Sequence, residues 1–179
     1  MKNDRTPYSH LSPAISGGFT LIELIIVITI IAILAAVALP RLIDAQRDAR
    51  IAKANALYGS IRSAAALARS RCELDIAGVA SNLAAANCQA ANPQVNMDGK
   101  AVDMVNRFPA ATTNGILAAA DINLAADGVN TGGSGCGSGA LCLDVTGGTA
   151  PNCRITYQAA TIAGTIITAP VISVTTSGC

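Results

Sequence analysis

The sequence predicts an α+β fold in which a long N-terminal helix packs on a C-terminal antiparallel β-meander. Three observations support this prediction: a continuous apolar run near the N-terminus, helical spacing of apolar residues beyond it, and strand-like segments separated by turn residues near the C-terminus. Aromatic residues make up only 3% of the chain. Small side chains bury little area each, so the six cysteines are candidate disulfide staples in an oxidising compartment.

The apolar run is long enough to cross a bilayer. It reads FTLIELIIVITIIAILAAVAL over residues 19–39, and Glu23 is its only charged residue. At about 1.5 Å per residue, these residues extend roughly 31 Å as a helix. A secretory signal peptide would be shorter and end at a small-x-small cleavage site, for which residues 35–38 are a poor match. A plain membrane anchor is the other alternative.

Glu23 argues against both alternatives, because a carboxylate in an apolar helix is costly in lipid unless it has a partner. Cleavage between Gly18 and Phe19 would create an α-amino group one helical turn away. In a helical stack, the amine of one chain could meet Glu23 of the next, which would satisfy both buried charges and fix the axial register. The pattern therefore predicts assembly through the apolar helices.

Pro40 ends the apolar run and is expected to kink or loosen the helix. Beyond it, apolar residues recur every three or four positions, which predicts an amphipathic helix to about Arg71. Residues 41–71 carry a net charge of +5, whereas residues 72–179 carry −4. We hypothesise that basic stems face acidic heads of neighbouring subunits; a solvated helix face is the alternative. The apolar positions are Ile51, Ala54, Leu57, Ile61, Ala64 and Ala68.

Residues 72–140 are poorly periodic, and the only elements expected there are a short helix over 114–122 and a flexible loop over 129–139. Residues 141–146 and 154–159 flank Gly147-Gly148, which predicts a hairpin. A further strand is expected over 165–175. Because Pro170 interrupts it, this strand should be bulged or lie at a sheet edge.

The stretch Gly17-Gly18-Phe19-Thr20-Leu21-Ile22-Glu23, followed by the apolar run, resembles the cleavage and methylation signature of type IV prepilins and the related pseudopilins. The resemblance implies that a membrane aspartyl peptidase cuts after Gly18 and methylates Phe19, and that Glu23 neutralises a neighbouring N-terminus. It implies the type IV pilin fold, with a cleaved leader (1–18), a transmembrane and polymerisation helix (19–40), its amphipathic half (41–71) and a disulfide-rich head (72–179).

Further stretches are similar to pilins of the mannose-sensitive haemagglutinin type, namely residues 38–68, VNRFPAATTNGI and CRITYQ. The resemblance implies a homopolymeric filament subunit in surface attachment or motility, made as an inner-membrane precursor and displayed as an extracellular pilus by a Gram-negative bacterium. The implied partners are the prepilin peptidase, the pilus assembly machinery and a host or surface receptor. The alternatives are a pseudopilin of a type II secretion system and a minor or competence pilin in DNA uptake.

The favoured disulfide pairs are Cys153–Cys179, Cys136–Cys142 and Cys72–Cys88. The first follows the C-terminal disulfide-bounded region of related pilins, and the other two join cysteines that are near in sequence. A rival set pairs Cys142 with Cys153 across the glycine turn and Cys136 with Cys179.

Catalytic, cofactor and metal roles are not expected. The single histidine, His10, lies in the expected leader, no nucleophile motif is present, and the cysteine spacings do not suit zinc. Nucleic-acid binding by the stem is not favoured, since aromatic residues are not interleaved with its arginines. Basic residues after the apolar run outnumber those before it, which by itself predicts a cytoplasmic C-terminal side. The prepilin motif and the cysteines instead place that side outside.

Overall fold

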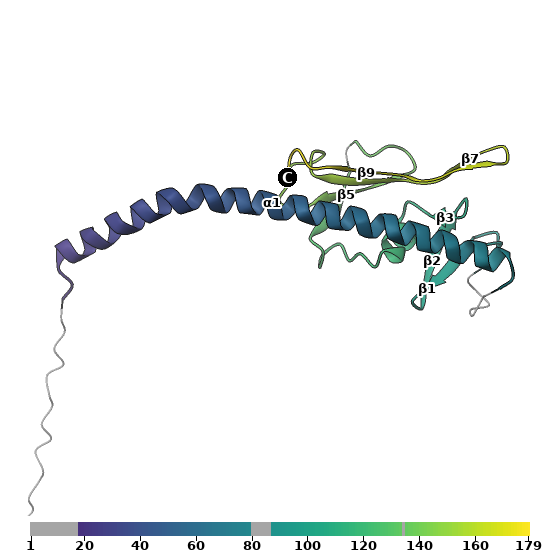
Figure 1. The fold of residues 1–179 in the computed structure, drawn as a ribbon, viewed down its shortest axis with the longest axis horizontal. Coiled ribbons are helices and arrows are strands. Elements are labelled where there is room, and N and C mark those ends of the chain that lie inside the picture. The colour runs from purple at the N-terminus through teal and green to yellow at the C-terminus, as the bar shows by residue number, and fades with distance from the viewer. Residues whose placement is uncertain (1–17, 80–86, 134) are drawn as a thin grey trace, which may run out of the picture. The chain divides into compact units, whose positions relative to one another are not determined.

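The computed structural model describes residues 18–79, 87–133 and 135–179. It confirms the α+β class, with one long helix followed by antiparallel sheets (Figure 1). The chain divides into two compact units, Met1–Ile43 and Asp44–Cys179. The elements are α1 (Leu21–Ile76), β1 (Gln94–Met97), β2 (Lys100–Val105), β3 (Phe108–Pro109), η1 (Thr113–Leu117), β4 (Val129–Thr131), β5 (Ala140–Val145), β6 (Arg154–Gln158), β7 (Thr161–Ala163), β8 (Ile166–Thr168) and β9 (Val171–Thr175).

Helix α1 continues through Pro40, so residues on both sides of the proline remain helical. Its start at Leu21 and its end at Ile76 lie close to the predicted bounds. Within the second unit, the predicted face is the one that the helix buries. Ala54, Ile61, Ala64 and Ala68 are each 5% exposed or less, as is Cys72 one turn further on. The helical spacing of small apolar residues therefore positioned this face correctly.

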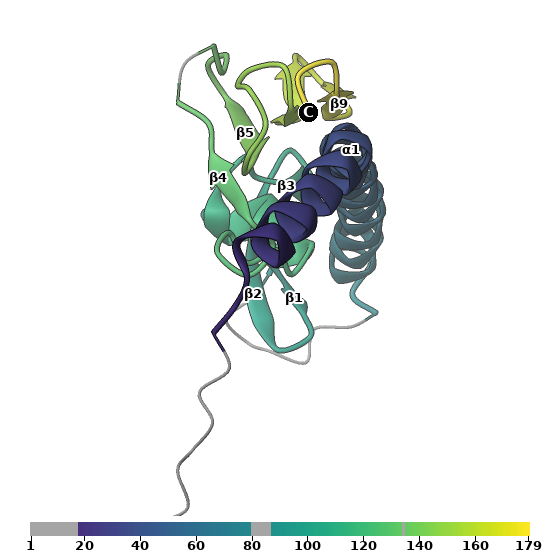
Figure 2. The same ribbon diagram turned by 90° about the vertical axis from the view of Figure 1, so that its left-hand side faces the viewer.

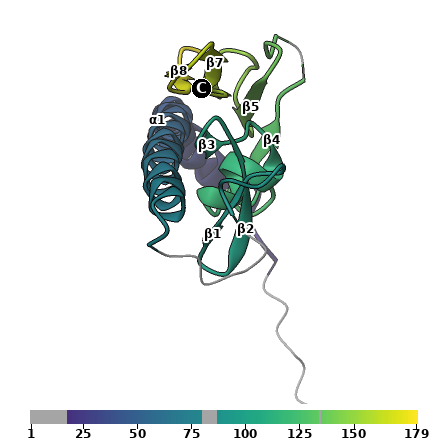
Figure 3. The same ribbon diagram turned by 90° about the vertical axis from the view of Figure 1, so that its right-hand side faces the viewer.

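The main sheet has four antiparallel strands in the order β4-β5-β6-β9. Leu143, Ile155 and Tyr157 from this sheet pack with Ile61 of α1 in one buried cluster. A second cluster joins the end of the helix to Val95, Val102 and Met104 of the sheet β1-β2-β3. Figures 2 and 3 show β1 and β2 on one side of the head and β7 to β9 on the opposite side. Alanines on the buried helix face allow both sheets to approach the helix closely.

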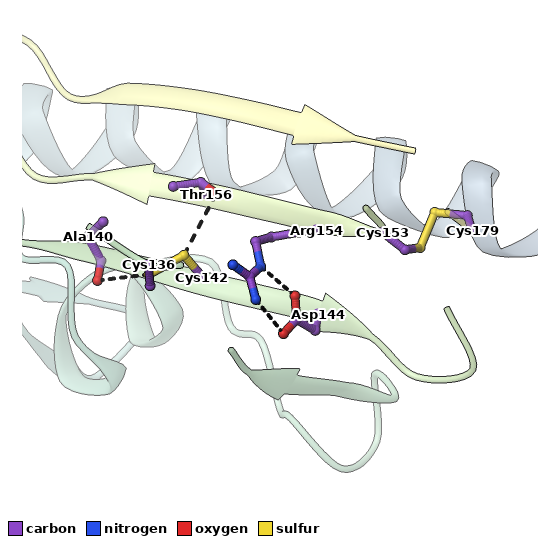
Figure 4. Close-up of polar contacts among 8 residues, drawn as sticks. All are labelled: Cys136, Ala140, Cys142, Asp144, Cys153, Arg154, Thr156 and Cys179. Carbon is purple, nitrogen blue, oxygen red and sulfur yellow. Dashed lines mark hydrogen bonds and ion pairs between the residues drawn. A yellow bond between two sulfur atoms is a disulfide. The ribbon is translucent and has the colours of Figure 1, made fainter. Parts of the chain in front are cut away.

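Arg154 and Asp144 form a paired contact across the main sheet. The guanidinium donates from Nε to Oδ1 at 2.5 Å and from Nη2 to Oδ2 at 2.9 Å, and Arg154 is only 5% exposed (Figure 4). These hydrogen bonds raise the pKa of Arg154, with burial acting in the opposite direction. The two residues are direct register partners on β5 and β6. The ion pair therefore fixes the register of the central hairpin.

The structure confirms the hairpin of residues 141–146 and 154–159, and it corrects three other expectations. The expected helix over 114–122 is shorter: a π-helical turn, η1, starts after Thr112, whose side chain accepts from the Gly115 N–H, and the helical residues end at position 119. The expected loop over 129–139 contains strand β4, whose Val129 is buried opposite Val145. The expected strand over 165–175 is divided by Pro170 into β8 and β9, since proline cannot continue the ladder, and β9 lies at the edge of the main sheet, as predicted.

Strands β1 and β2 were not predicted from the sequence. They are joined by Asp98-Gly99, whose φ angles of 50° and 79° both lie in the left-handed region. Asp-Gly between apolar-alternating segments is among the strongest two-residue hairpin signals. The Ala-rich and Asn-rich surroundings obscured this signal.

Candidate functional site

Helix α1 begins with a reciprocal cap formed by Thr20 and Glu23. The Glu23 N–H donates to Thr20 Oγ1 at 3.3 Å, and the Thr20 hydroxyl donates to Glu23 Oε2 at 3.4 Å. Threonine followed three residues later by glutamate is the sequence pattern of a capping box. This second role of Glu23 was missed in the sequence, although the pattern was there to find. The cap holds the carboxylate at the first turn, where the helix dipole favours a negative charge.

Gly18 and Phe19 lie before the helix and are exposed. Phe19 is 84% exposed, so its ring has no packing role among the described residues. A Cβ added at Gly18 would meet no heavy atom within 4 Å, and its φ does not lie in the left-handed region. The described structure therefore places no steric demand for glycine at position 18. A requirement for glycine there would have to come from another molecule that reads the sequence.

The helix from Leu21 to Ile43 is apolar on all sides. Every large aliphatic side chain in this segment is at least 46% exposed within the described structure. An 18-residue window reaches a mean hydropathy of 3.0, so by length and composition this helix could cross a membrane. A helix that is hydrophobic all round requires lipid or other protein around it. This segment is thus a surface that external partners must cover.

Glu23 is the one carboxylate on this apolar surface, and the one other charged residue of the segment, Arg41, lies near its far end. Among the residues that the structure describes, Glu23 forms no ion pair, and its contacts are those with Thr20. One carboxylate oxygen, Oε1, therefore remains available as an acceptor. A positively charged donor from outside the described chain segment could bind there without breaking the cap.

Gly18, Phe19 and Glu23 thus lie within one short segment at the start of the helix, and Pro40 lies inside the helix almost five turns further on. The six cysteines lie apart from this segment, in the second unit. They form three disulfides, Cys72–Cys88, Cys136–Cys142 and Cys153–Cys179. These are the pairs of the favoured set rather than the rival set. No group of three His, Cys, Asp or Glu side chains suited to a metal ion occurs among the described residues.

Comparison with known proteins supports the interpretation of the N-terminal segment. The model of the prokaryotic N-terminal methylation motif matches residues 15–39. The major component of the type IV narrow pilus of Thermus thermophilus, PilA5, is 53% identical over 51 residues, which is 28% of this chain and 44% of that protein. The matched region therefore spans less than half of the relative. No solved structure matches the chain.

The motif and the relative together support a type IV pilin. The resemblance to the mannose-sensitive haemagglutinin type stays a prediction, since neither comparison concerns that subgroup. The matched residues 15–39 include the whole candidate site from Gly18 to Glu23.

Proposed function

We propose that this chain is a type IV pilin that is cut after Gly18 and polymerises through its apolar helix into an extracellular filament. The observation that carries the proposal is the exposed apolar surface of α1 from Leu21 to Ile43, interrupted by one carboxylate at its first turn. Lipid can cover the apolar side chains of a single chain. Only a specific cationic partner satisfies the carboxylate as well.

Cleavage would supply that partner. Hydrolysis of the peptide bond between Gly18 and Phe19 releases the leader carboxylate and leaves an α-ammonium group on Phe19. The ammonium of one subunit then donates to Glu23 of its neighbour, at the carboxylate oxygen that Thr20 does not occupy. In this contact the two buried charges compensate each other, and their pairing sets the axial stagger between subunits. N-methylation of Phe19 keeps the positive charge, so it is compatible with this role.

The apolar helices also explain how a subunit can leave the membrane. In the filament, helices of neighbouring subunits cover one another, so apolar side chains move from lipid to protein without facing water. The precursor is accordingly held in the inner membrane and the mature subunit in the pilus. The relative is named as a major pilus component, which supports a structural rather than an enzymatic role. We propose surface attachment or motility as the task of the filament.

The test compares two glycine substitutions in the full-length precursor. Gly18→Ala is expected to leave the fold unchanged but to block cleavage, because the structure itself needs no glycine there. Gly59→Ala is the matched control, since a Cβ at this helical position also meets nothing within 4 Å. Immunoblots of membranes and of sheared surface fibres separate precursor from mature protein. Normal processing of Gly18→Ala would contradict the proposed cleavage site.

A further inference from the structure

A groove runs along the head between α1 and strand β9. It has a volume of about 630 Å³, and one wall is formed by helix residues, namely two alanines, two arginines, Tyr58 and Ser70. The opposite wall is aliphatic and is formed by Pro170, Val171 and Ile172. Two arginines, Arg62 and Arg69, line this groove, and no carboxylate does. The groove therefore suits a segment that combines an apolar side chain with a negative charge.

The two arginines differ in their contacts within the chain. Arg69 lies over the Phe108 ring at 4.9 Å and pairs weakly with Glu73 at 4.0 Å. Arg62 is exposed and has no ion-pair partner among the residues that the structure describes. Arg69 is thus a fixed part of the wall, whereas the charge of Arg62 remains available to a partner.

One acidic side chain of the head, like Arg62 on the helix, is exposed and has no ion-pair partner among the described residues. The carboxylates of the head form hydrogen bonds or ion pairs within the chain in five of seven cases, namely Glu73, Asp103, Asp121, Asp127 and Asp144. A sixth, Asp75, is half-buried, with one carboxylate oxygen fully covered. Asp98 is exposed and has no partner among the described residues. It is therefore the exposed head carboxylate that no described residue of the same chain already pairs with.

Asp98 lies at the tip of the β1–β2 hairpin, directly after Met97. The neighbouring Lys100 is paired with Asp121, so these three charges leave the tip with a net charge of −1. Met97 is partly buried against the second core cluster, so the tip offers mainly its carboxylate, on a tight two-residue turn. This carboxylate supplies the negative charge that the groove suits.

The groove and the tip lie on opposite sides of the head. In Figures 1 and 2, β9 lies above helix α1 and the β1–β2 hairpin lies below it. One chain therefore does not fill its own groove with its own tip. A contact between two such different surfaces is heterologous, and repeating it adds copies in an open series rather than closing a dimer.

We propose that the β1–β2 tip of one copy docks in the α1–β9 groove of the next, with Asp98 paired to Arg62. This contact rests on the proposed function, because it provides the lateral register of heads in a filament held together by the helices. It also names one pair of residues through which the basic stem and the acidic head of neighbouring copies would attract each other. Charge pairing of this kind selects partner and orientation more than it adds affinity.

The test uses charge reversal in the full-length protein. Arg62→Glu and Asp98→Lys alone are each expected to lower the yield of sheared filaments by about tenfold or more, and the double reversal to restore it to within about threefold. Arg47→Glu is the matched control, since Arg47 is also exposed on α1 but does not line the groove. Equal loss in the control, or no rescue in the double variant, would overturn the pairing.

A second measurement does not depend on assembly yield. Arg62→Lys keeps the charge and introduces an amine that carbodiimide can couple to a carboxylate in direct contact. Coupling between position 62 and Asp98 is expected in filaments and not in detergent-dispersed monomers. Filaments without this cross-link would contradict the docking.

Two outcomes separate the inference from the function on which it rests. If the unmodified protein forms no filaments, the proposed function fails. If it forms filaments and all charge variants do so equally well, only the docking fails. Binding of single-stranded DNA that is lost in Arg62→Glu, without rescue of assembly by the double reversal, would assign the groove to nucleic acid instead.

Discussion

Replacing Glu23 by glutamine isolates the charge on which the proposed assembly depends. Glutamine is nearly isosteric with glutamate and can still accept from the Thr20 hydroxyl, so the reciprocal cap at the helix start is retained. The substitution removes only the negative charge. Glu23→Ala removes the charge and the side-chain hydrogen bond from Thr20, while the backbone N–H of residue 23 can still donate to Thr20 Oγ1. The difference between the two variants therefore reports the side-chain hydrogen bond.

The expected effect is large. In the filament, the neighbour's α-ammonium would remain buried without its counter-charge, which costs about 3–5 kcal/mol when one member of a buried ion pair is removed. This corresponds to about a hundred- to several-thousand-fold weaker subunit addition. The exposed side-chain hydrogen bond from Thr20 contributes about 1 kcal/mol at most, so Glu23→Gln should resemble Glu23→Ala closely. Without the carboxylate the helix is also more stable in lipid, so the equilibrium between membrane and filament shifts further toward the membrane.

The assay measures processing and assembly separately. The mature N-terminus is detected in isolated membranes, and filament protein is measured in sheared fractions from the same cells. Both variants are expected to be cleaved normally and to accumulate in the membrane. Filaments of Glu23→Gln at the level of the unmodified protein would refute the ammonium–carboxylate pairing. Loss in Glu23→Ala alone would show that the side-chain hydrogen bond with Thr20, rather than the charge, is what assembly needs.

Three further predictions concern the head. Replacing Cys153 and Cys179 together by alanine should lower the free energy of unfolding by about 3.5 kcal/mol from loop entropy, because the disulfide joins residues 26 apart. Urea titration followed by circular dichroism measures this loss. A loss no larger than that from removing the short Cys136–Cys142 loop would contradict the prediction. Tyr157→Phe should cost about 1–2 kcal/mol by leaving the Pro109 carbonyl without the phenol that donates to it at 2.7 Å. Burial raises the pKa of Tyr157, so the contribution of its neutral phenol to the free energy of unfolding is fully present below about pH 10 and is lost as the pH rises further. If stability falls with the same slope at alkaline pH in the phenylalanine variant, this role of Tyr157 is wrong. Gly132→Ala should cost about 1–3 kcal/mol, because its Cβ would lie 2.6 Å from a carboxylate oxygen of the buried ion pair, whereas Gly133→Ala has nothing within 4 Å and should be neutral in the same urea titration.

The candidate site was predictable from the sequence because its parts are local. Gly18, Phe19 and Glu23 fall within six consecutive residues, and a lone carboxylate in an apolar helix has few physical explanations. The helix and its buried face were predictable for a similar reason, since periodic spacing expresses burial directly. The cap is equally local, since threonine followed three residues later by glutamate is a capping-box pattern.

The head was less predictable because its arrangement depends on contacts between distant residues. Val129 is buried only because Val145 lies beside it, and the short β4 has no recognisable strand pattern of its own. The groove joins the helix around Arg62 to β9, which follows more than 100 residues later. No spacing rule in the sequence relates two such segments. Their proximity results from the sheet order β4-β5-β6-β9 and from the packing of that sheet on α1.

The most direct test of the central claim is the mass of the N-terminal peptide from sheared surface fibres. The account predicts that filament subunits begin at Phe19, carry a methyl group on that residue and lack residues 1–18. Fibres built from subunits that retain the leader, or recovery of this protein only as an uncleaved monomer, would contradict it.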